Sequence, residues 1–176
     1  MGRYTPGPWI YRLEAFLVNV LFVCMGNICR SPIAQGVFED LVRAEGLGDD
    51  ISVDSAGTGS WHIGEPPDPR ARDSAKKRGY DLESQRARKI TPEDCGKFDH
   101  ILVMDEENYR TVSALCGRSG SRVRLLLDYA PESGAREVPD PYFGGSAGFE
   151  HALDLVESAT KGLLNDIRER KLAERG

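Results

Sequence analysis

The sequence predicts an α/β fold: a three-layer sandwich with a central four-stranded parallel sheet, strand order 2-1-3-4, and helices on both faces. Short runs of branched apolar residues alternate along the chain with longer segments whose apolar residues recur every three or four positions. Strands that alternate with helices in this way are typical of a parallel sheet covered on both sides. The first run is the most apolar, so we expect it at the centre of the sheet.

The first half of the chain supplies two expected strands and one expected helix. Residues 16–24 are branched and aromatic with little alternation, as in a strand buried on both faces. Ser31 and Pro32 follow, and serine favours the N-cap of a helix while proline favours its first turn. We therefore expect a helix from this point to Gly46, and then a second short strand over 51–54.

The second half continues the alternation. Asp68 as N-cap and Pro69 at the first helical position predict a helix that ends at Gly79. The remaining expected elements are a helix start at 91–94, a strand at 98–104, a helix at 105–115, a strand at 123–127 and a long amphipathic helix through 149–167.

Length and composition limit the number of domains and the kinds of partner that we expect. The chain has 176 residues, enough for one compact domain. We expect a flexible leader at 1–16, a single domain at 17–170 and a frayed tail at 171–176. The net charge of -5 argues against nucleic-acid binding. The apolar stretch at 16–25 is too short to cross a bilayer, so no membrane partner is expected. We expect a cytoplasmic protein, a monomer or weak dimer.

The cysteine count indicates a reduced protein. The four cysteines contain no C-x2-C pair, and they are few for a disulfide scaffold. We therefore interpret Cys95 and Cys116 as structural bystanders. The three histidines show no metal-ligand spacing, and no metal or other cofactor is expected.

The segment from Cys24 to Ser31 is the one that carries chemistry. It places a C-x5-R pattern, Cys24 to Arg30, between a buried strand and a helix start. A loop there presents several backbone N–H groups and the positive end of a helix dipole, which together bind anions. Gly26 allows close approach of the backbone, and Arg30 can grip two phosphate oxygens. The same field favours the thiolate of Cys24, a nucleophile for phosphoryl transfer.

Residues 20–38, VLFVCMGNICRSPIAQGVF, resemble the signature of the low-molecular-weight protein tyrosine phosphatases. Further landmarks agree in order and separation: 53–58, Trp61, 86–88, 103–105 and 138–142. The resemblance covers about residues 18 to 170.

The resemblance implies a role for each matching residue. Cys24 would attack phosphorus and form a phosphocysteine intermediate, and Arg30 would bind the phosphate. Asp140 would protonate the phenolic leaving oxygen and then act as base for water. The phosphate-binding loop would comprise Met25, Gly26, Asn27, Ile28, Cys29 and Ser31. In it Ser31 would donate a hydrogen bond to the thiolate, and Asn27, supported by Ser55, would hold the loop in shape.

The resemblance also bears on substrate and regulation. Trp61 and Tyr142 would flank the pocket and accept the ring of a phosphotyrosine in a protein or peptide, and Ile28 points to the same substrate. Cys29 would be a redox partner of Cys24, although a plain buried thiol explains it equally well. Gln85 stands where many relatives have a histidine near the loop.

Three alternatives remain open. An arsenate reductase-like thiol enzyme would need a further close cysteine pair, and Cys95 and Cys116, with 20 residues between them, do not suggest one. A cysteine protease would need a partnering histidine, and the sequence nominates none. A non-catalytic phosphoprotein-binding module would not need Cys24, Arg30 and Asp140 together.

Overall fold

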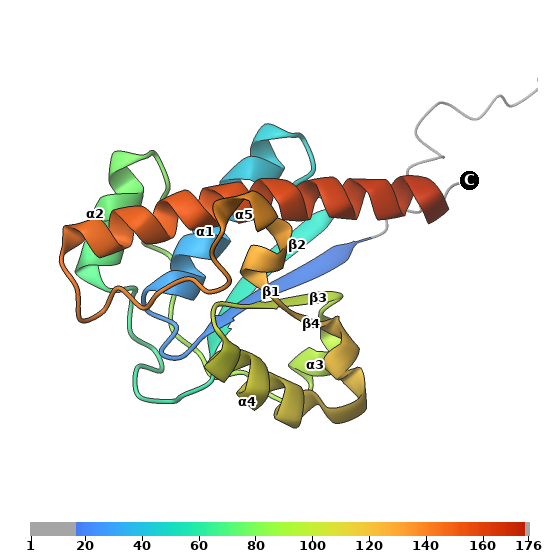
Figure 1. Cartoon of the computed structure of the whole chain (residues 1–176), viewed down its shortest axis with the longest axis horizontal. Helices are drawn as coiled ribbons and strands as arrows, with labels where there is room; N and C mark the ends of the chain where they lie inside the picture. Colours follow the sequence, from blue (N-terminus) through green and yellow to red (C-terminus); the bar gives the residue numbers. More distant parts are fainter. Residues whose placement is uncertain (1–16, 175–176) are drawn as a thin grey trace, which may run out of the picture.

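The computed structural model describes residues 17–174 (Figure 1). The expected leader at 1–16 lies outside the described residues, as do residues 175 and 176 of the expected tail. The strands are β1 (Val18–Cys24), β2 (Ile51–Gly57), β3 (His100–Val103) and β4 (Val123–Leu125). The helices are α1 (Arg30–Ala44), α2 (Pro69–Lys77), α3 (Asp94–Lys97), α4 (Glu106–Cys116) and α5 (Ser146–Glu174). Three short 3-10 turns are η2 (Gly117–Arg122), η3 (Leu126–Tyr129) and η4 (Pro131–Ser133).

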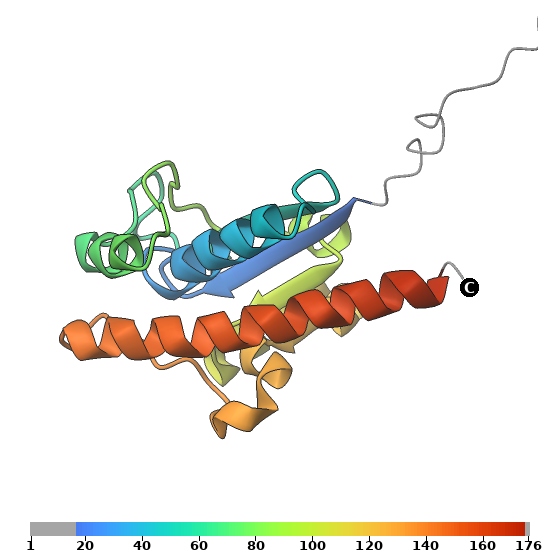
Figure 2. The ribbon, with the colours of Figure 1, turned by 90° about the horizontal axis from the view of Figure 1, so that it is seen from above.

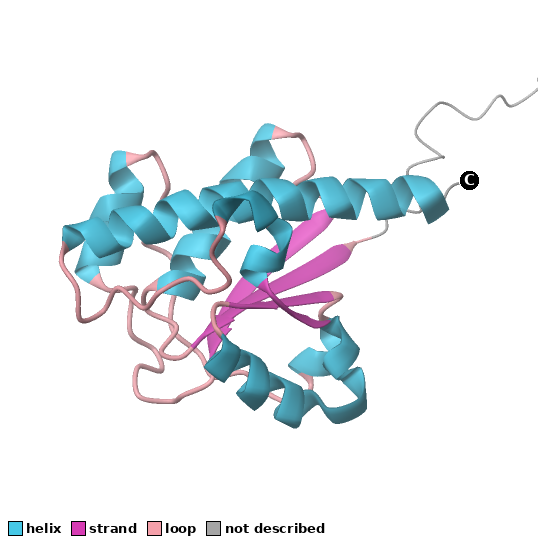
Figure 3. Ribbon diagram, in the orientation of Figure 1, coloured by secondary structure: helices cyan, strands magenta, loops and turns pink. Residues whose placement is uncertain are grey.

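The four strands form one parallel sheet in the order β2-β1-β3-β4 (Figure 3). The strand β1 lies between β2 and β3, so the most apolar strand is central, as predicted. Its register with β2 sets Cys24 beside Gly57 at the carboxyl edge of the sheet. The predicted fold class and strand order are confirmed.

Alternate side chains of β1 enter two separate cores. Val20 and Phe22 pack with α1, α2 and α5, whereas Leu21 and Val23 pack on the opposite face toward α4. All four are fully buried. Figure 1 shows α1 and the long α5 on one side of the sheet and α4 on the other, and Figure 2 shows α1 and α5 side by side. Burial on both faces explains why the strand shows little alternation.

Several helix and strand boundaries in the structure differ from the predicted ones. The second strand continues to Gly57, because it pairs with β1 along its whole length. The fourth strand ends at Leu125, after which the chain turns into η3. The helix expected near residue 91 begins at Asp94, whose carboxylate accepts hydrogen bonds from the backbone N–H and hydroxyl of Thr91 at 2.8 and 3.3 Å.

Cys95 and Cys116 form a disulfide, with 5.4 Å between their Cα atoms. The cysteine count indicated a reduced protein, and for Cys95 and Cys116 that expectation was wrong. Between them β3 runs toward the carboxyl edge for about 13 Å at 3.3 Å per residue, and α4 returns about 16 Å at 1.5 Å per residue. The two displacements nearly cancel, so the chain brings the cysteines back together.

Candidate active site

The candidate site is a pocket at the carboxyl edge of the sheet, where β1 passes into α1. Its volume is about 270 Å³. Loop residues and three later segments line it: Cys24, Met25, Gly26, Ile28, Cys29, Arg30, Trp61, His62, Asp140, Tyr142 and Phe143. The structure therefore brings together the three residues to which the resemblance assigns catalysis, although Arg30 and Asp140 are 110 positions apart.

Backbone hydrogen bonds hold the loop that follows Cys24. The N–H of Thr58 donates to the Cys24 carbonyl, and that of Gly59 donates to the Met25 carbonyl, both at 2.9 Å. A Cβ at Gly57 would lie 2.7 Å from the carbonyl oxygen of Met25, so only glycine allows this close approach. The segment that follows β2 thus packs against the loop and supports it through backbone hydrogen bonds.

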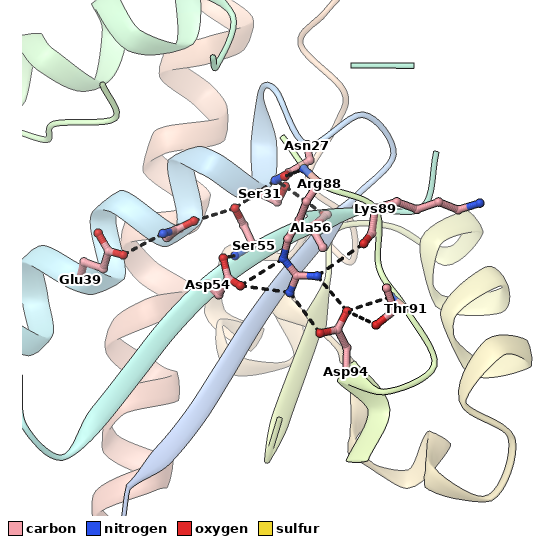
Figure 4. Close-up of polar contacts among 11 residues, drawn as sticks. Asn27, Ser31, Glu39, Asp54, Ser55, Ala56, Arg88, Lys89, Thr91 and Asp94 are labelled. Carbon is pink, nitrogen blue, oxygen red and sulfur yellow. Dashed lines mark hydrogen bonds and ion pairs between the residues drawn. The ribbon is translucent and has the colours of Figure 1, made fainter. Parts of the chain in front are cut away.

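Asn27 holds the loop from within. Its backbone has a positive φ of 56°, a left-handed conformation that asparagine tolerates better than most residues. Its buried amide nitrogen donates to the hydroxyls of Ser31 and Ser55, at 2.8 and 3.0 Å. Its amide oxygen accepts from the backbone N–H of Arg88 at 3.0 Å. Figure 4 shows this amide between the loop, β2 and the segment after α2.

Ser31 lies beside the sulfur of Cys24, with 3.0 Å between Oγ and Sγ. The expectation that Ser31 caps α1 was wrong, because the helix begins one residue earlier at Arg30 and has no side-chain cap. The Ser31 hydroxyl accepts a hydrogen bond from Asn27 and contacts the sulfur of Cys24 instead of capping the helix. A hydroxyl at this distance can donate to a thiolate.

Arg30 is buried at the base of the pocket and is oriented by two acceptors. One terminal nitrogen donates to Asp105 at 2.6 Å and to the Val138 carbonyl at 3.0 Å. The other lies 3.5 Å from a carboxylate oxygen of Asp140. Burial alone would lower the pKa of Arg30, but the negative charges of Cys24, Asp105 and Asp140 outweigh it and raise this pKa. The guanidinium is a permanently charged, fixed anion binder.

Sequence reasoning treated Asp105 only as a landmark, and it did not identify the Val138 carbonyl at all. Asp105 follows directly after β3 and Met104, so its position at the carboxyl edge of the sheet was an available signal. The carbonyl of Val138 carries no sequence signal, because every residue has one.

The walls of the pocket are aromatic. The indole of Trp61 folds over Gly59, where a Cβ would come within 1.8 Å of the ring. Tyr142 stacks edge-on against Phe143 at 4.9 Å, and its backbone N–H donates to Asp140 at 3.0 Å. Trp61 and Phe143 are 70% and 90% exposed, so the rim offers apolar surface to a ligand. His62, at the same rim, lies 2.7 Å from Glu65.

The two cysteines of the loop differ in environment. Both are free thiols, and both line the pocket. Burial, together with the negative charge of Asp68, raises the pKa of Cys29 well above its ordinary value. Cys29 is therefore a protonated thiol at neutral pH.

Gln85, which stands in the place of the family histidine, donates from its amide nitrogen to the Pro32 carbonyl at 3.0 Å. It supports the first turn of α1 from outside the pocket. The hydrogen-bond partners of the Asn27 amide are Ser31, Ser55 and Arg88, and Gln85 is not among them.

The disulfide lies far from the pocket. Cys116 ends α4, whereas the start of this helix at Asp105 contacts Arg30. The eleven residues of α4 span about 16 Å. This pair therefore cannot accept a disulfide directly from Cys24, which argues against an arsenate reductase relay on grounds of distance.

No helix among residues 17–174 is long and apolar enough to cross a membrane. Over the same residues there is no group of three or more histidine, cysteine or acidic side chains that could hold a metal ion.

Comparisons with known proteins agree with the site. The family model of the low molecular weight phosphotyrosine protein phosphatases matches residues 19–173. A low molecular weight protein-tyrosine-phosphatase of Streptomyces coelicolor is 43% identical over 156 residues, covering 86% of this chain and 94% of its own. The YfkJ phosphatase of Bacillus subtilis is 39% identical over 156 residues, covering 88% and 99%.

Solved structures show the same architecture. A protein tyrosine phosphatase from Entamoeba histolytica, with Hepes in its active site, superposes with a TM-score of 0.85 at 36% identity. The match covers 88% of this chain and 99% of that one. The signature around Cys24, the pocket and these likenesses converge: the chain belongs to the low molecular weight phosphotyrosine protein phosphatase family and is a cysteine-dependent protein-tyrosine phosphatase.

Proposed function

We propose that the pocket hydrolyses phosphotyrosine with Cys24 as nucleophile, Arg30 as phosphate binder and Asp140 as general acid and base. One observation carries the proposal: these three side chains line a single pocket at the end of β1. The loop from Met25 to Cys29, together with Ser31, would cradle the phosphate, as backbone N–H groups at a helix start do.

In the first step, the thiolate of Cys24 attacks phosphorus, a sulfur–phosphorus bond forms and the bond to the phenolic oxygen breaks. Asp140 donates its proton to that oxygen, and the tyrosine leaves neutral.

In the second step, Asp140 accepts a proton from water, and the water oxygen attacks phosphorus. The sulfur–phosphorus bond breaks, inorganic phosphate leaves and the Cys24 thiolate is restored. The hydroxyl of Ser31, 3.0 Å from Sγ, would stabilise the leaving thiolate. Arg30 would hold the phosphoryl oxygens throughout, because Asp105 and Val138 keep it oriented.

The walls support an aryl phosphate as substrate. Trp61 and Tyr142 can enclose a phenyl ring, and Ile28 lines the pocket with apolar surface. A relative from Vibrio vulnificus, Wzb, has been crystallised with benzylphosphonate, an aromatic phosphonate. We propose that the substrate is a phosphotyrosine in a protein or peptide, and that the phosphatase is a cytoplasmic monomer or weak dimer.

We further propose that Cys29 protects Cys24 from irreversible oxidation. The Cys24 thiolate would attack hydrogen peroxide, break its O–O bond and become a sulfenic acid with release of hydroxide. The Cys29 thiol would then form a disulfide with Cys24 and release water, and external thiols would reduce that disulfide. After a peroxide pulse and dithiothreitol, wild type should recover activity and Cys29→Ser should not. Equal recovery would leave Cys29 as a plain buried thiol.

The test of the central proposal is hydrolysis of p-nitrophenyl phosphate by wild type and Cys24→Ser, in EDTA, across pH. Wild type should turn over without metal, and Cys24→Ser should lose turnover while still binding inorganic phosphate. Residual turnover near the wild-type rate would remove Cys24 as nucleophile. If reduced wild type is inactive, a phosphoprotein-binding module or arsenate reduction with thiols becomes the next hypothesis.

A further inference from the structure

We propose that Arg88, which lies outside the pocket, is a positioning residue: it holds Asn27 so that the Ser31 hydroxyl faces Cys24. The inference rests on the proposed function, in which Cys24 is the nucleophile. Arg88 does not line the pocket and touches no reacting atom. It acts through the hydrogen bonds that join Arg88, Asn27 and Ser31, drawn in Figure 4, and through the contact of Ser31 with Cys24.

The first step of the argument is the orientation of the Asn27 amide. Its oxygen accepts the backbone N–H of Arg88 at 3.0 Å, and its nitrogen donates to the hydroxyls of Ser31 and Ser55. An amide has a donor end and an acceptor end, so the Arg88 N–H selects which end faces the loop. Without that donor, the opposite orientation would compete.

The second step is the direction of the Ser31 hydroxyl. Because Ser31 accepts a hydrogen bond from Asn27, its own hydrogen is available to donate. The sulfur of Cys24 lies at 3.0 Å and the carbonyl of Ala56 at 3.4 Å, so the shorter contact is with sulfur. The chain of donors from Arg88 through Asn27 and Ser31 therefore ends on the nucleophile.

The third step is what fixes residue 88 itself. Its guanidinium bridges two carboxylates, Asp54 of β2 at 3.0 and 3.1 Å and Asp94 of α3 at 2.9 and 3.2 Å. Asp94 is buried, and it also accepts from the backbone N–H of Thr91. The Arg88 carbonyl accepts from Gly57 at 2.8 Å. These bonds fix residue 88 to the edge of β2 and to α3.

The fourth step is the lack of a regular element around residue 88. Between α2 and α3 the described chain forms no helix or strand. Its backbone is held near residue 88 by an isolated bridge between Gly57 and Lys89 and by single hydrogen bonds: Ala87 with Gly64 and Glu65, and Arg88 and Ile90 with Gly57. The guanidinium of Arg88 adds side-chain contacts to these bonds, and both together orient the N–H of residue 88 toward Asn27.

The matched pair of variants is Arg88→Met and Arg86→Met. Arg86 is exposed and bonds only to nearby carbonyls, those of Glu83 and Gln85, so it controls for charge and for this segment. With p-nitrophenyl phosphate, Arg88→Met should lower kcat by roughly 10- to 100-fold with a smaller change in KM, because misplacement affects the chemical step. Arg86→Met should be unchanged, and Arg88→Lys should recover part of the loss.

The second readout is the pH dependence of Cys24 alkylation by iodoacetate, followed by peptide mass spectrometry. Cys29 does not interfere, because burial raises its pKa, and the other two cysteines form the disulfide. In Arg88→Met the midpoint of alkylation should move upward by roughly half to one pH unit, as expected for weakening one hydrogen bond to the thiolate. The other titratable groups of the pocket stay the same in both variants: Cys29, Arg30, His62, Asp140 and Tyr142.

Two results would overturn the inference. One is that Arg88→Met and Arg86→Met behave alike in both measurements. The other is a loss of activity that only matches the unfolded fraction, with the alkylation midpoint unmoved. If Arg88→Met does not fold, Asp54→Asn replaces it, since this side chain is 42% exposed, and an unmoved midpoint there has the same meaning. Alkylation reports on the Cys24 thiol whether or not Cys24 is the nucleophile. A failure of the proposed function can therefore be told apart from a failure of the role proposed for Arg88.

Discussion

The guanidinium of Arg30 and the carboxylate of Asp105 meet at 2.6 Å beneath the pocket, although 75 positions separate them in the chain. Asp105 also caps α4, because its other oxygen accepts the N–H of Asn108 at 2.8 Å. One carboxylate thus fixes both the phosphate-binding cation and the helix on the opposite side of the sheet. A partly buried charge pair of this kind orients its members more than it stabilises the fold.

Asp105→Asn should separate these two roles. Asparagine keeps the helix cap but loses the charge that orients Arg30. We expect kcat to fall by about tenfold or more, since misplacement of a transition-state contact costs that much. The melting temperature should change little. Steady-state kinetics with p-nitrophenyl phosphate and thermal melts check this, and an unchanged kcat would show that Val138 alone orients the guanidinium.

Asp140→Asn should slow phosphotyrosine hydrolysis by about 10²- to 10⁴-fold, the usual effect of losing a general acid. The loss should shrink for aryl phosphates whose phenols are more acidic, because these leave without a proton. The measurement is kcat across a series of substituted phenyl phosphates. Asp128→Asn, at an exposed aspartate outside the pocket, is the control. An equal loss on every substrate would speak against the acid role.

Asp94 should make stability depend on pH. Burial opposes its ionisation, but hydrogen bonds from Arg88 and Thr91 outweigh this and lower the pKa of Asp94. The folded state therefore binds the proton more weakly than the unfolded chain, whose aspartate titrates near pH ~3.9. The stabilisation is fully present above that pH and is lost as pH falls through the lower folded value.

Urea unfolding of wild type and Asp94→Asn at several pH values measures this. Wild type should be more stable by a constant margin from about pH 5 upward, and the margin should shrink below about pH 4. A margin that does not vary with pH would mean that the charge of Asp94 contributes nothing beyond its hydrogen bonds.

Cys116→Ser should lower the free energy of unfolding by about 2–4 kcal/mol under oxidising conditions, as expected for losing a disulfide that closes a loop of this length. In dithiothreitol, wild type and Cys116→Ser should unfold at the same denaturant concentration. Cys95→Ser is the matched variant, and the double variant should lose no more than either single one. A difference that persists in dithiothreitol would assign the effect to packing.

Activity should hardly respond to Cys116→Ser in the folded protein, because about 16 Å of α4 separates the disulfide from Arg30. The same two variants, assayed with p-nitrophenyl phosphate, test this. A large fall in kcat without unfolding would connect the disulfide to the loop through α3, where Cys95 is the neighbour of Asp94.

Elements with a strong local pattern were predictable. The apolar run of β1 predicted a central strand, and Asp68 with Pro69 predicted the start of α2, where Asp68 indeed accepts from the N–H of Arg70. Periodicity and capping act over a few residues, so one sequence suffices to detect them. The strand order is confirmed as well by the pairing of the strands, and burial on both faces accounts for the central place of β1.

Local preference misled where a side chain had a partner outside the short pattern that predicted its role. Ser31 has the character of an N-cap, yet its hydroxyl bonds to Cys24 and Asn27 rather than to the start of α1. Cys95 and Cys116 looked unrelated at their spacing and are joined in the structure. In both cases a contact made after folding outweighed what neighbouring residues indicate.

The chain alone indicated the phosphatase signature, the sheet and most of the residues that line the pocket, because these lie in motifs that resemble those of the family or follow from periodicity. Folding decided the contacts that orient them: Asp105 to Arg30 across 75 positions, and Arg88 to Asn27 across 61. Such contacts join groups that every sequence contains in abundance, a carboxylate here and a backbone N–H there. Only the folded structure shows which carboxylate and which N–H lie at hydrogen-bond distance from a site residue, and this sets them apart from the other groups of the same kind.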